Sequence, residues 1–175
     1  MRKLVIQVGE VFGVVDRITD DIRKGGIMLG TVNWVLTKAL TDEKYISDFE
    51  KEYDIIFPAE YKATIIESNG GRPRPNVFDS VDRIELVAKS LLSFDKTHKE
   101  NIWDTYDQLK NHLSKDVIPF MSDQFGNYVC FDYRNTKIPS IVFWDHELSN
   151  EHLGSVIIDV VDSYIEFLDS LYNIE

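Results

Sequence analysis

The chain has 175 residues, of which 43% are hydrophobic and 12% aromatic. This is enough to build the core of one domain of ordinary size, and it excludes a disordered chain. The 30 acidic residues outnumber the 19 basic ones and give a net charge of −11. That charge argues against binding to nucleic acid or to anionic lipid, because both would repel it. It fits a soluble protein, or one whose partner is basic.

Cysteine content and hydropathy exclude further classes. The single cysteine, Cys130, excludes an internal disulfide framework and a thiolate zinc site. Apolar runs such as Ile141–Trp144 are far shorter than the roughly 18 residues that a membrane span needs. The apolar run at the start of the chain is broken by Gln7 and Glu10 before it reaches the length of a signal peptide. A cytoplasmic location without membrane attachment is predicted.

Residues 1–30 differ in character from the rest of the chain. They carry five basic and four acidic residues, so nearly all of the net negative charge lies in residues 31–175. Two short apolar runs, Leu4–Val8 and Val11–Val15, favour strands. We expect residues 1–30 to form an N-terminal extension, either an extra hairpin or a loosely attached arm. Residues 31–175 are expected to form the main domain.

The main domain begins with a predicted amphipathic helix that starts at Asp42. Thr41 is its expected N-cap, since a hydroxyl can accept a bond from an unpaired amide of the first turn. The apolar stripe of this helix, at three- and four-residue spacing, is Ile46, Phe49 and Tyr53.

A second helix is expected from about Pro58 to Ser68. Pro58 suits a helix start because its missing N–H would be unpaired there anyway. Asn69-Gly70-Gly71 should end it, because glycine adopts the left-handed conformation without a steric penalty. Residues 72–75, Arg-Pro-Arg-Pro, are expected to be an extended linker.

The segment that follows gives weaker signals. Ile84–Val87 suggests a strand, and Leu91–Phe94 a short helical turn. Apolar residues at helical spacing between Ile102 and Leu113 then predict another amphipathic helix.

Three strands and a closing helix are predicted in the last third of the chain. The strands are Val117–Phe120, Asn127–Tyr133 and Pro139–Asp145. A long helix is expected from about Ser155, with one face formed by Val156, Val160, Tyr164, Phe167 and Leu171. The succession predicts an α+β fold, in which an antiparallel β-sheet meander packs against amphipathic helices.

Four blocks of residues occur in an order that is fairly specific. They are Phe49-Glu50-x-x-Tyr53-x-Ile55-x-Phe57-Pro58-x-x-Tyr61-Lys62 with Asn69-Gly70-Gly71, Ile118-Pro119-Phe120-x-x-Asp123-x-x-Gly126-Asn127-x-x-Cys130-x-Asp132, Ile141-x-x-Trp144-Asp145-His146-Glu147, and Ser163-Tyr164-x-x-Phe167-Leu168. Together they resemble the SUKH superfamily, in its Smi/Knr-like branch. The resemblance covers roughly residues 34–172 and leaves residues 1–30 outside the family pattern.

The resemblance implies a SUKH-like fold and a binding protein with no catalytic site of its own. Many bacterial members are immunity proteins that bind a toxin in the cell that produces it, and fungal relatives are scaffolds in cell-wall regulation. We therefore expect a bacterial immunity protein, with no cofactor, that occludes a cognate toxin domain stoichiometrically. A basic, nuclease-type toxin would complement the acidic chain. The alternative is a non-enzymatic scaffold or regulatory interaction protein.

Two other kinds of chemistry, a cysteine nucleophile and a metal site, have simpler alternative interpretations. Cys130 could be a nucleophile, but it lies between apolar residues of a predicted strand in an acidic chain, which favours a buried, inert thiol. Asp145-His146-Glu147 with His152 could bind a metal, but their spacing places the two histidines on no common helical face. They are expected to be polar residues of a loop, and no metal site is predicted.

Acidic side chains on loops held by rigid elements are the expected partner-binding residues, because such loops commonly carry function. Asp79, Asp82, Asp123, Asp145, Glu147 and Glu151 are the candidates. Tyr133 and Trp144 are candidate aromatic anchors, although core packing explains Trp144 more simply. The alternative for any one acid is a solubilising role.

Overall fold

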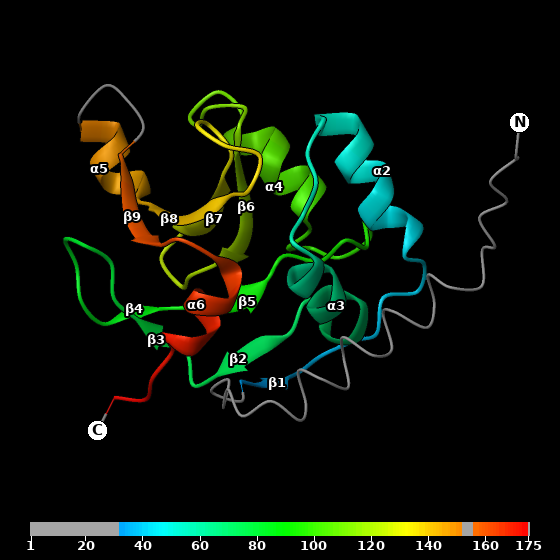
Figure 1. Cartoon of the computed structure of the whole chain (residues 1–175), viewed down its shortest axis with the longest axis horizontal. Helices are drawn as coiled ribbons and strands as arrows, with labels where there is room; N and C mark the ends of the chain where they lie inside the picture. Colours follow the sequence, from blue (N-terminus) through cyan, green and yellow to red (C-terminus); the bar gives the residue numbers. More distant parts are fainter. Residues whose placement is uncertain (1–31, 152–155, 175) are drawn as a thin grey trace, which may run out of the picture.

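The centre of the protein is a five-stranded antiparallel sheet, seen in a computed structural model that describes residues 32–151 and 156–174 (Figure 1). Its strands lie in the order β5 (Ser90–Leu91), β6 (Val117–Ser122), β7 (Tyr128–Asp132), β8 (Ser140–Trp144) and β9 (Ile157–Val161). The three predicted strands are β6, β7 and β8, which are buried along almost their whole length. The predicted extension, residues 1–30, lies outside the described residues.

Two small antiparallel ribbons lie beside the main sheet. One pairs β1 (Asn33–Val35) with β2 (Arg72–Arg74), and the other pairs β3 (Val77–Phe78) with β4 (Leu86–Val87). The expectation that residues 72–75 form only a linker is therefore wrong. The prolines hold the backbone extended, as predicted, but β1 supplies a pairing partner that the local sequence does not reveal.

The first two predicted helices are present as α2 (Lys44–Tyr53) and α3 (Ala59–Ser68). The N-cap assigned to Thr41 is wrong. The amide of Lys44 instead donates to the Asp42 side chain at 2.9 Å, so a carboxylate two residues before the helix takes this role.

The end of α3 follows the prediction from Asn69-Gly70-Gly71. Gly70 has a φ of +70°, in the left-handed region. The amide of Gly71 donates to the Ser68 carbonyl at 2.8 Å. A Cβ at Gly71 would lie 2.8 Å from that carbonyl oxygen, so a side chain would force the turn open. Both glycines are therefore required by the chain reversal after α3.

The next helix, α4 (Ile102–Leu109), begins at Asn101, whose side chain accepts the Asp104 amide at 2.8 Å. It ends four residues before the predicted end at Leu113, although Leu113 is buried against the sheet. A further short helix, α5 (His146–Glu151), occupies a segment that was expected to be a loop.

The long helix predicted from Ser155 is wrong. Residues 157–161 form the edge strand β9, and only Tyr164–Asp169 form a helix, α6, which is capped by the Ser163 hydroxyl. The apolar residues of β9 are β-branched, which favours a pleated strand over a helix. The helical turn expected at Leu91–Phe94 is also wrong, because β5 pairs there with β6.

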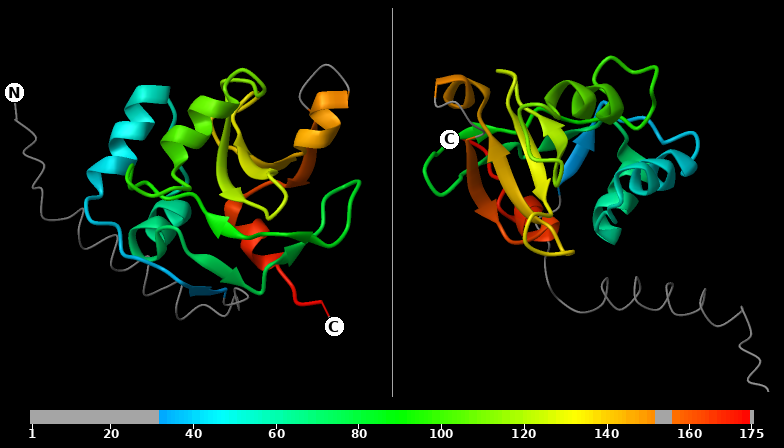
Figure 2. Two further views of the ribbon diagram at one scale, coloured as in Figure 1. Left: turned by 180° about the vertical axis from the view of Figure 1, so that it is seen from behind. Right: turned by 90° about the horizontal axis from the view of Figure 1, so that it is seen from above.

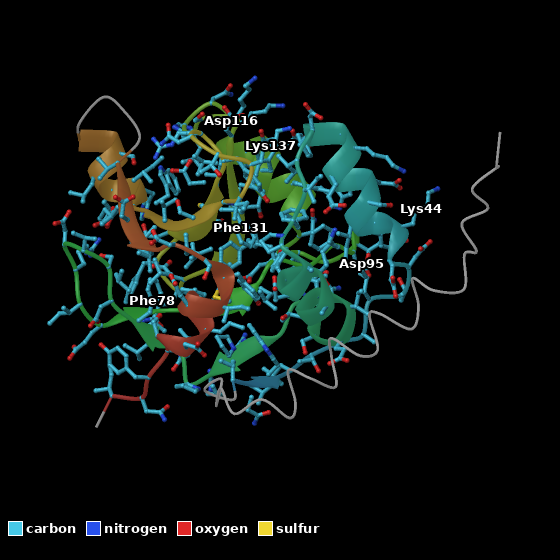
Figure 3. The ribbon with its side chains drawn as sticks, viewed as in Figure 1. Lys44, Phe78, Asp95, Asp116, Phe131 and Lys137 are labelled. Carbon is cyan, nitrogen blue, oxygen red and sulfur yellow. The ribbon has the colours of Figure 1, made fainter. Side chains whose placement is uncertain are left out.

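Aromatic side chains fill the core on one face of the sheet. Phe131 lies at its centre (Figure 3) and stacks on Phe120 with ring centroids 4.3 Å apart. Phe49 of α2 packs edge-on against Trp103 of α4 at 5.0 Å. A second cluster includes Cys130, the neighbour of Phe131 in β7, because side chains alternate between the two faces of a strand. The fold is α+β, with helices packed on an antiparallel sheet, as predicted.

Candidate protein-binding surface

The loop between β3 and β4, Asp79–Glu85, extends away from the body of the protein in all views (Figures 1 and 2). We call it the acidic loop. Across its tip, the Ser80 amide donates to the Arg83 carbonyl at 2.8 Å, and the Arg83 amide donates to the Ser80 hydroxyl at 3.1 Å. At its base, Asp79 accepts from the Glu85 amide at 2.9 Å and from the Tyr172 hydroxyl at 2.7 Å. These bonds fix the shape of the loop.

Two contacts join the acidic loop to the main sheet. The Val81 amide donates to the Asp159 carbonyl of β9 at 3.0 Å. Arg83 forms an ion pair with Asp145, which is buried at the end of β8. Asp145 also accepts the Glu147 amide at 3.0 Å and so caps the first turn of α5. One buried carboxylate therefore holds the loop and α5 together.

Exposed carboxylates surround this junction and form what we call the acidic face. Its members are Asp79, Asp82, Glu85 and Glu147. The hydrogen bonds from the Glu85 amide and the Tyr172 hydroxyl hold the pKa of Asp79 below its ordinary value of 3.8. Asp79 is therefore ionised at neutral pH, and the loop presents a fixed negative charge.

The acidic loop also carries two aliphatic side chains that point into solvent. Val81 and Ile84 are each 74% exposed. Neither contributes to the hydrophobic core of the described residues. The surface therefore combines two apolar side chains with a surrounding set of carboxylates.

Asp123 lies in the β6–β7 turn and has a structural environment. Its side chain is buried and accepts from the Phe125 amide at 2.7 Å and the Asn127 amide at 2.8 Å, as the turn chemistry of Asp predicts. The Asn127 side chain in turn accepts the His146 amide at 3.0 Å. Asp123 thus positions this turn beside α5 rather than offering a free carboxylate.

The two aromatic candidates are not exposed side chains. Trp144 is only 5% exposed and packs with Cys130 and Val142 in the second cluster, so the interpretation of Trp144 as a core residue is confirmed. Tyr133 lies just past the opposite end of β7 and donates its hydroxyl to the Ile56 carbonyl at 2.9 Å. The structure brings neither side chain to the acidic loop.

Tyr133 lines a groove of about 490 Å³, which we call the Tyr133 groove. The residues around it are Asp54, Ile55, Ile56, Asp116, Tyr133, Asn135, Thr136 and Lys137. Asp116 and Lys137 lie together at this groove, far from Phe78, which directly precedes the acidic loop (Figure 3). The groove and the acidic loop therefore occupy different sides of the molecule.

The chemistry weighed at Cys130 finds no support in its surroundings. Burial raises the pKa of the Cys130 thiol well above its ordinary value, and the Asp132 carboxylate raises it further. The residue is therefore a buried, protonated thiol, as predicted.

The metal site considered as an alternative would use the side chains of Asp145, His146, Glu147 and His152. Asp145 is occupied by Arg83 and by the α5 cap, and the His146 ring bonds the Asn127 side chain at 2.8 Å. His152 lies outside the described residues. Within residues 32–151 and 156–174, no group of three or more His, Cys, Asp or Glu side chains could hold a metal ion.

Part of the acidic face is predicted from the sequence. The candidates Asp79, Asp82, Asp145 and Glu147 are brought together by the fold, and the backbone of Glu151 ends α5. Val81 and Ile84 are not among the predicted site residues. The segment Asp-Ser-Val-Asp-Arg-Ile-Glu places both aliphatic residues among charges, but Ile84 is predicted from the sequence to belong to a strand, which in the structure begins only at Leu86.

An antiparallel sheet with helices packed on it and a projecting, charged loop define this chain as a small α+β domain. Residues 43–168 match the family model SUKH_6, described as SMI1-KNR4 cell-wall, and the chain belongs to this family. The chain is also 35% identical over 80 residues to the SPbeta prophage-derived uncharacterized protein YokK of Bacillus subtilis (strain 168). That match covers 46% of this chain and 38% of the length of YokK. Among the described residues, no helix is long and apolar enough to cross a membrane.

Proposed function

We propose that this protein is a cytoplasmic immunity protein that binds a cognate toxin domain one to one and neutralises it by covering the active site of the toxin. The toxin is of the basic, nuclease type, and this chain contributes neither a cofactor nor a catalytic step. The observation that carries the proposal is the acidic face, in which Asp79, Asp82 and Glu85 lie on one fixed loop and Glu147 follows the buried Asp145 that holds this loop.

Electrostatic complementarity explains why such a face suits a nuclease. An enzyme that grips nucleic acid presents Lys and Arg to the phosphate backbone. A negative surface of opposite shape is attracted to these residues and raises the association rate, to about 10⁸ M⁻¹s⁻¹ at low salt in favourable cases. Because the acidic loop projects from the body and is already ordered by its own hydrogen bonds, little conformational entropy is lost when it enters a concave site.

Membership in the SUKH family supports the same function, since the resemblance of the four sequence blocks implies toxin binding in many bacterial members. A scaffold role is the second candidate. It is favoured by the Tyr133 groove, because a hollow surface away from the acidic loop would allow a second partner to be held at the same time.

Isothermal titration tests the proposal. The full chain is titrated with the C-terminal domain of a large secreted protein encoded beside it, at two salt concentrations. We expect one-to-one binding in the nanomolar range that weakens as salt rises, because the attraction between exposed charges is screened. Absence of heat at micromolar concentrations, with both proteins folded, overturns the proposal for this pairing and favours the scaffold.

A pair of charge reversals locates the binding surface. Asp82→Lys with Glu85→Lys changes the acidic loop, and Glu52→Lys with Glu67→Lys makes the same change in net charge on exposed positions of α2 and α3. We expect the loop variant to weaken binding by roughly 10-fold or more and the helix variant by much less. Equal weakening by both variants would show that only net charge matters and would remove the acidic face from the interface.

A further inference from the structure

The acidic loop has a composition that electrostatics alone does not explain. Val81 and Ile84 are three residues apart in one loop and are each 74% exposed, although nothing in the fold of the described residues uses them. Single exposed aliphatic residues are common on protein surfaces. Here two of them share a loop whose position is fixed at its base, across its tip and against β9.

We propose that Val81 and Ile84 form the apolar anchor of the partner-binding site, and that the partner offers a hydrophobic pocket surrounded by Lys and Arg side chains. This inference rests on the proposed function and specifies the chemistry of the toxin surface. The apolar side chains supply the contact area that is removed from water, and the acidic residues around them supply orientation and attraction.

The negative charge around Val81 and Ile84 favours a basic protein over the other possible partners, anionic lipid and a second copy of the chain. Asp79, Asp82 and Glu85 lie within the same seven residues as the two aliphatic side chains, with Arg83 as the only base in the loop, and it is paired with Asp145. Anionic lipid would be repelled by these carboxylates. A second copy of the chain, docked through the same loop, would bring like charges together. A basic protein surface is the partner that both components of the loop fit.

The rigidity of the acidic loop increases the contribution of Val81 and Ile84 to binding affinity. Asp79 is bonded to both the Glu85 amide and the Tyr172 hydroxyl, and Arg83 is held by the buried Asp145. The two aliphatic side chains are therefore presented on a backbone that is ordered before binding, so that little backbone entropy is lost in the complex. Loss of the anchor should then shorten the lifetime of the complex.

The test compares two matched double variants of the full chain. Val81→Ser with Ile84→Ser removes the anchor. Ile56→Ser with Ile138→Ser removes two similarly exposed aliphatic side chains, 73% and 78% exposed, of which Ile56 lines the Tyr133 groove and Ile138 directly follows its lining residue Lys137. Each protein is titrated with the toxin domain used above, and association and dissociation are followed by surface plasmon resonance. Thermal unfolding confirms that all variants keep the stability of the wild type, as expected for exposed positions.

We expect the loop variant to bind roughly 10- to 100-fold more weakly, with nearly all of the change in koff and an unchanged salt dependence. The Ile56/Ile138 variant should bind within about twofold of the wild type. If the wild type binds and the loop variant binds equally well, the anchor is overturned while the immunity function stands. If the wild type itself does not bind, both proposals fall.

Discussion

The two ends of the central sheet differ in shape and in the kind of bond that holds them. At the end where β8 stops, the acidic loop projects into solvent and is held by the buried carboxylate of Asp145. At the opposite end, the Tyr133 groove is hollow and is lined by side chains of both charges. A neutral hydrogen bond from the Tyr133 hydroxyl to the Ile56 carbonyl joins two of its lining residues. The first end therefore offers a projection of fixed shape and the second a hollow surface.

The largest expected effect on stability tests whether Asp145 is the central link of the loop end. Asp145→Ala removes the cap of α5 and the partner of Arg83. We expect the free energy of unfolding to fall by about 1–3 kcal/mol, because a helix cap and a charged hydrogen bond are both lost. Chemical denaturation measures this change.

A matched variant at the groove end sharpens the same comparison. Asp116→Ala removes a half-buried carboxylate beside the Tyr133 groove and should change stability by less than about 0.5 kcal/mol. Arg83→Met should cost less than Asp145→Ala, because the Arg83 side chain is 43% exposed and ion pairs with an exposed partner contribute only about 0–1 kcal/mol. Equal losses of unfolding free energy in Asp145→Ala and Asp116→Ala would show that the two ends of the sheet do not differ in how strongly they are held.

An intermediate effect is expected at the groove end. Burial raises the pKa of Tyr133 well above its ordinary value, and the Glu50 carboxylate raises it further, so the hydroxyl stays protonated and donates to Ile56. Tyr133→Phe removes only this bond and should lower the free energy of unfolding by about 1 kcal/mol. Denaturant unfolding of the wild type and of Tyr133→Phe measures this difference in unfolding free energy. A loss as large as that of Asp145→Ala would mean that both ends depend on equally strong links.

The smallest expected effect concerns the base of the acidic loop at low pH. The folded pKa of Asp79 is lowered, so its stabilising contribution is present above the unfolded value, near the ordinary 3.8, and is lost as pH falls through the lower folded value. We expect the contact between Asp79 and Tyr172 to be fully kept above pH 3.8 and to weaken only at pH values below it.

An NMR titration of the Asp79 carboxyl carbon measures this midpoint, and Asp79→Asn is the control that removes the titration. A midpoint at or above 3.8 would contradict the hydrogen-bonded arrangement of the loop base.

Much of the fold could be predicted because local patterns and tertiary contacts agree there. The stripe of Ile46 and Phe49 defines α2, and the glycines at 70 and 71 define the end of α3. The prediction failed after Ser155, where Val156–Val161 and Tyr164–Leu171 were merged into one helical pattern. Apolar spacing fits both periods over so short a distance, and pairing with β8 decided in favour of a strand.

The candidate site was predicted as separate pieces. Asp79 and Asp82 were selected from one loop and Asp145 and Glu147 from another, more than sixty positions later in the chain. Nothing local indicates that Arg83 pairs with Asp145, since this contact arises only when the β3–β4 ribbon lies against β9. For the same reason, the burial of Asp123 and the distance of Tyr133 from the loop could not be foreseen.

Local sequence is enough to predict an acidic chain with one buried cysteine, three apolar strands, and the glycine stop at the end of α3. Contacts between distant segments set which acids share a surface, leave Val81 and Ile84 in solvent, and pair residues 157–161 as a strand. The reason is physical. Caps and turns depend on neighbours within a few residues, whereas exposure and sheet pairing depend on contacts between segments far apart in the chain.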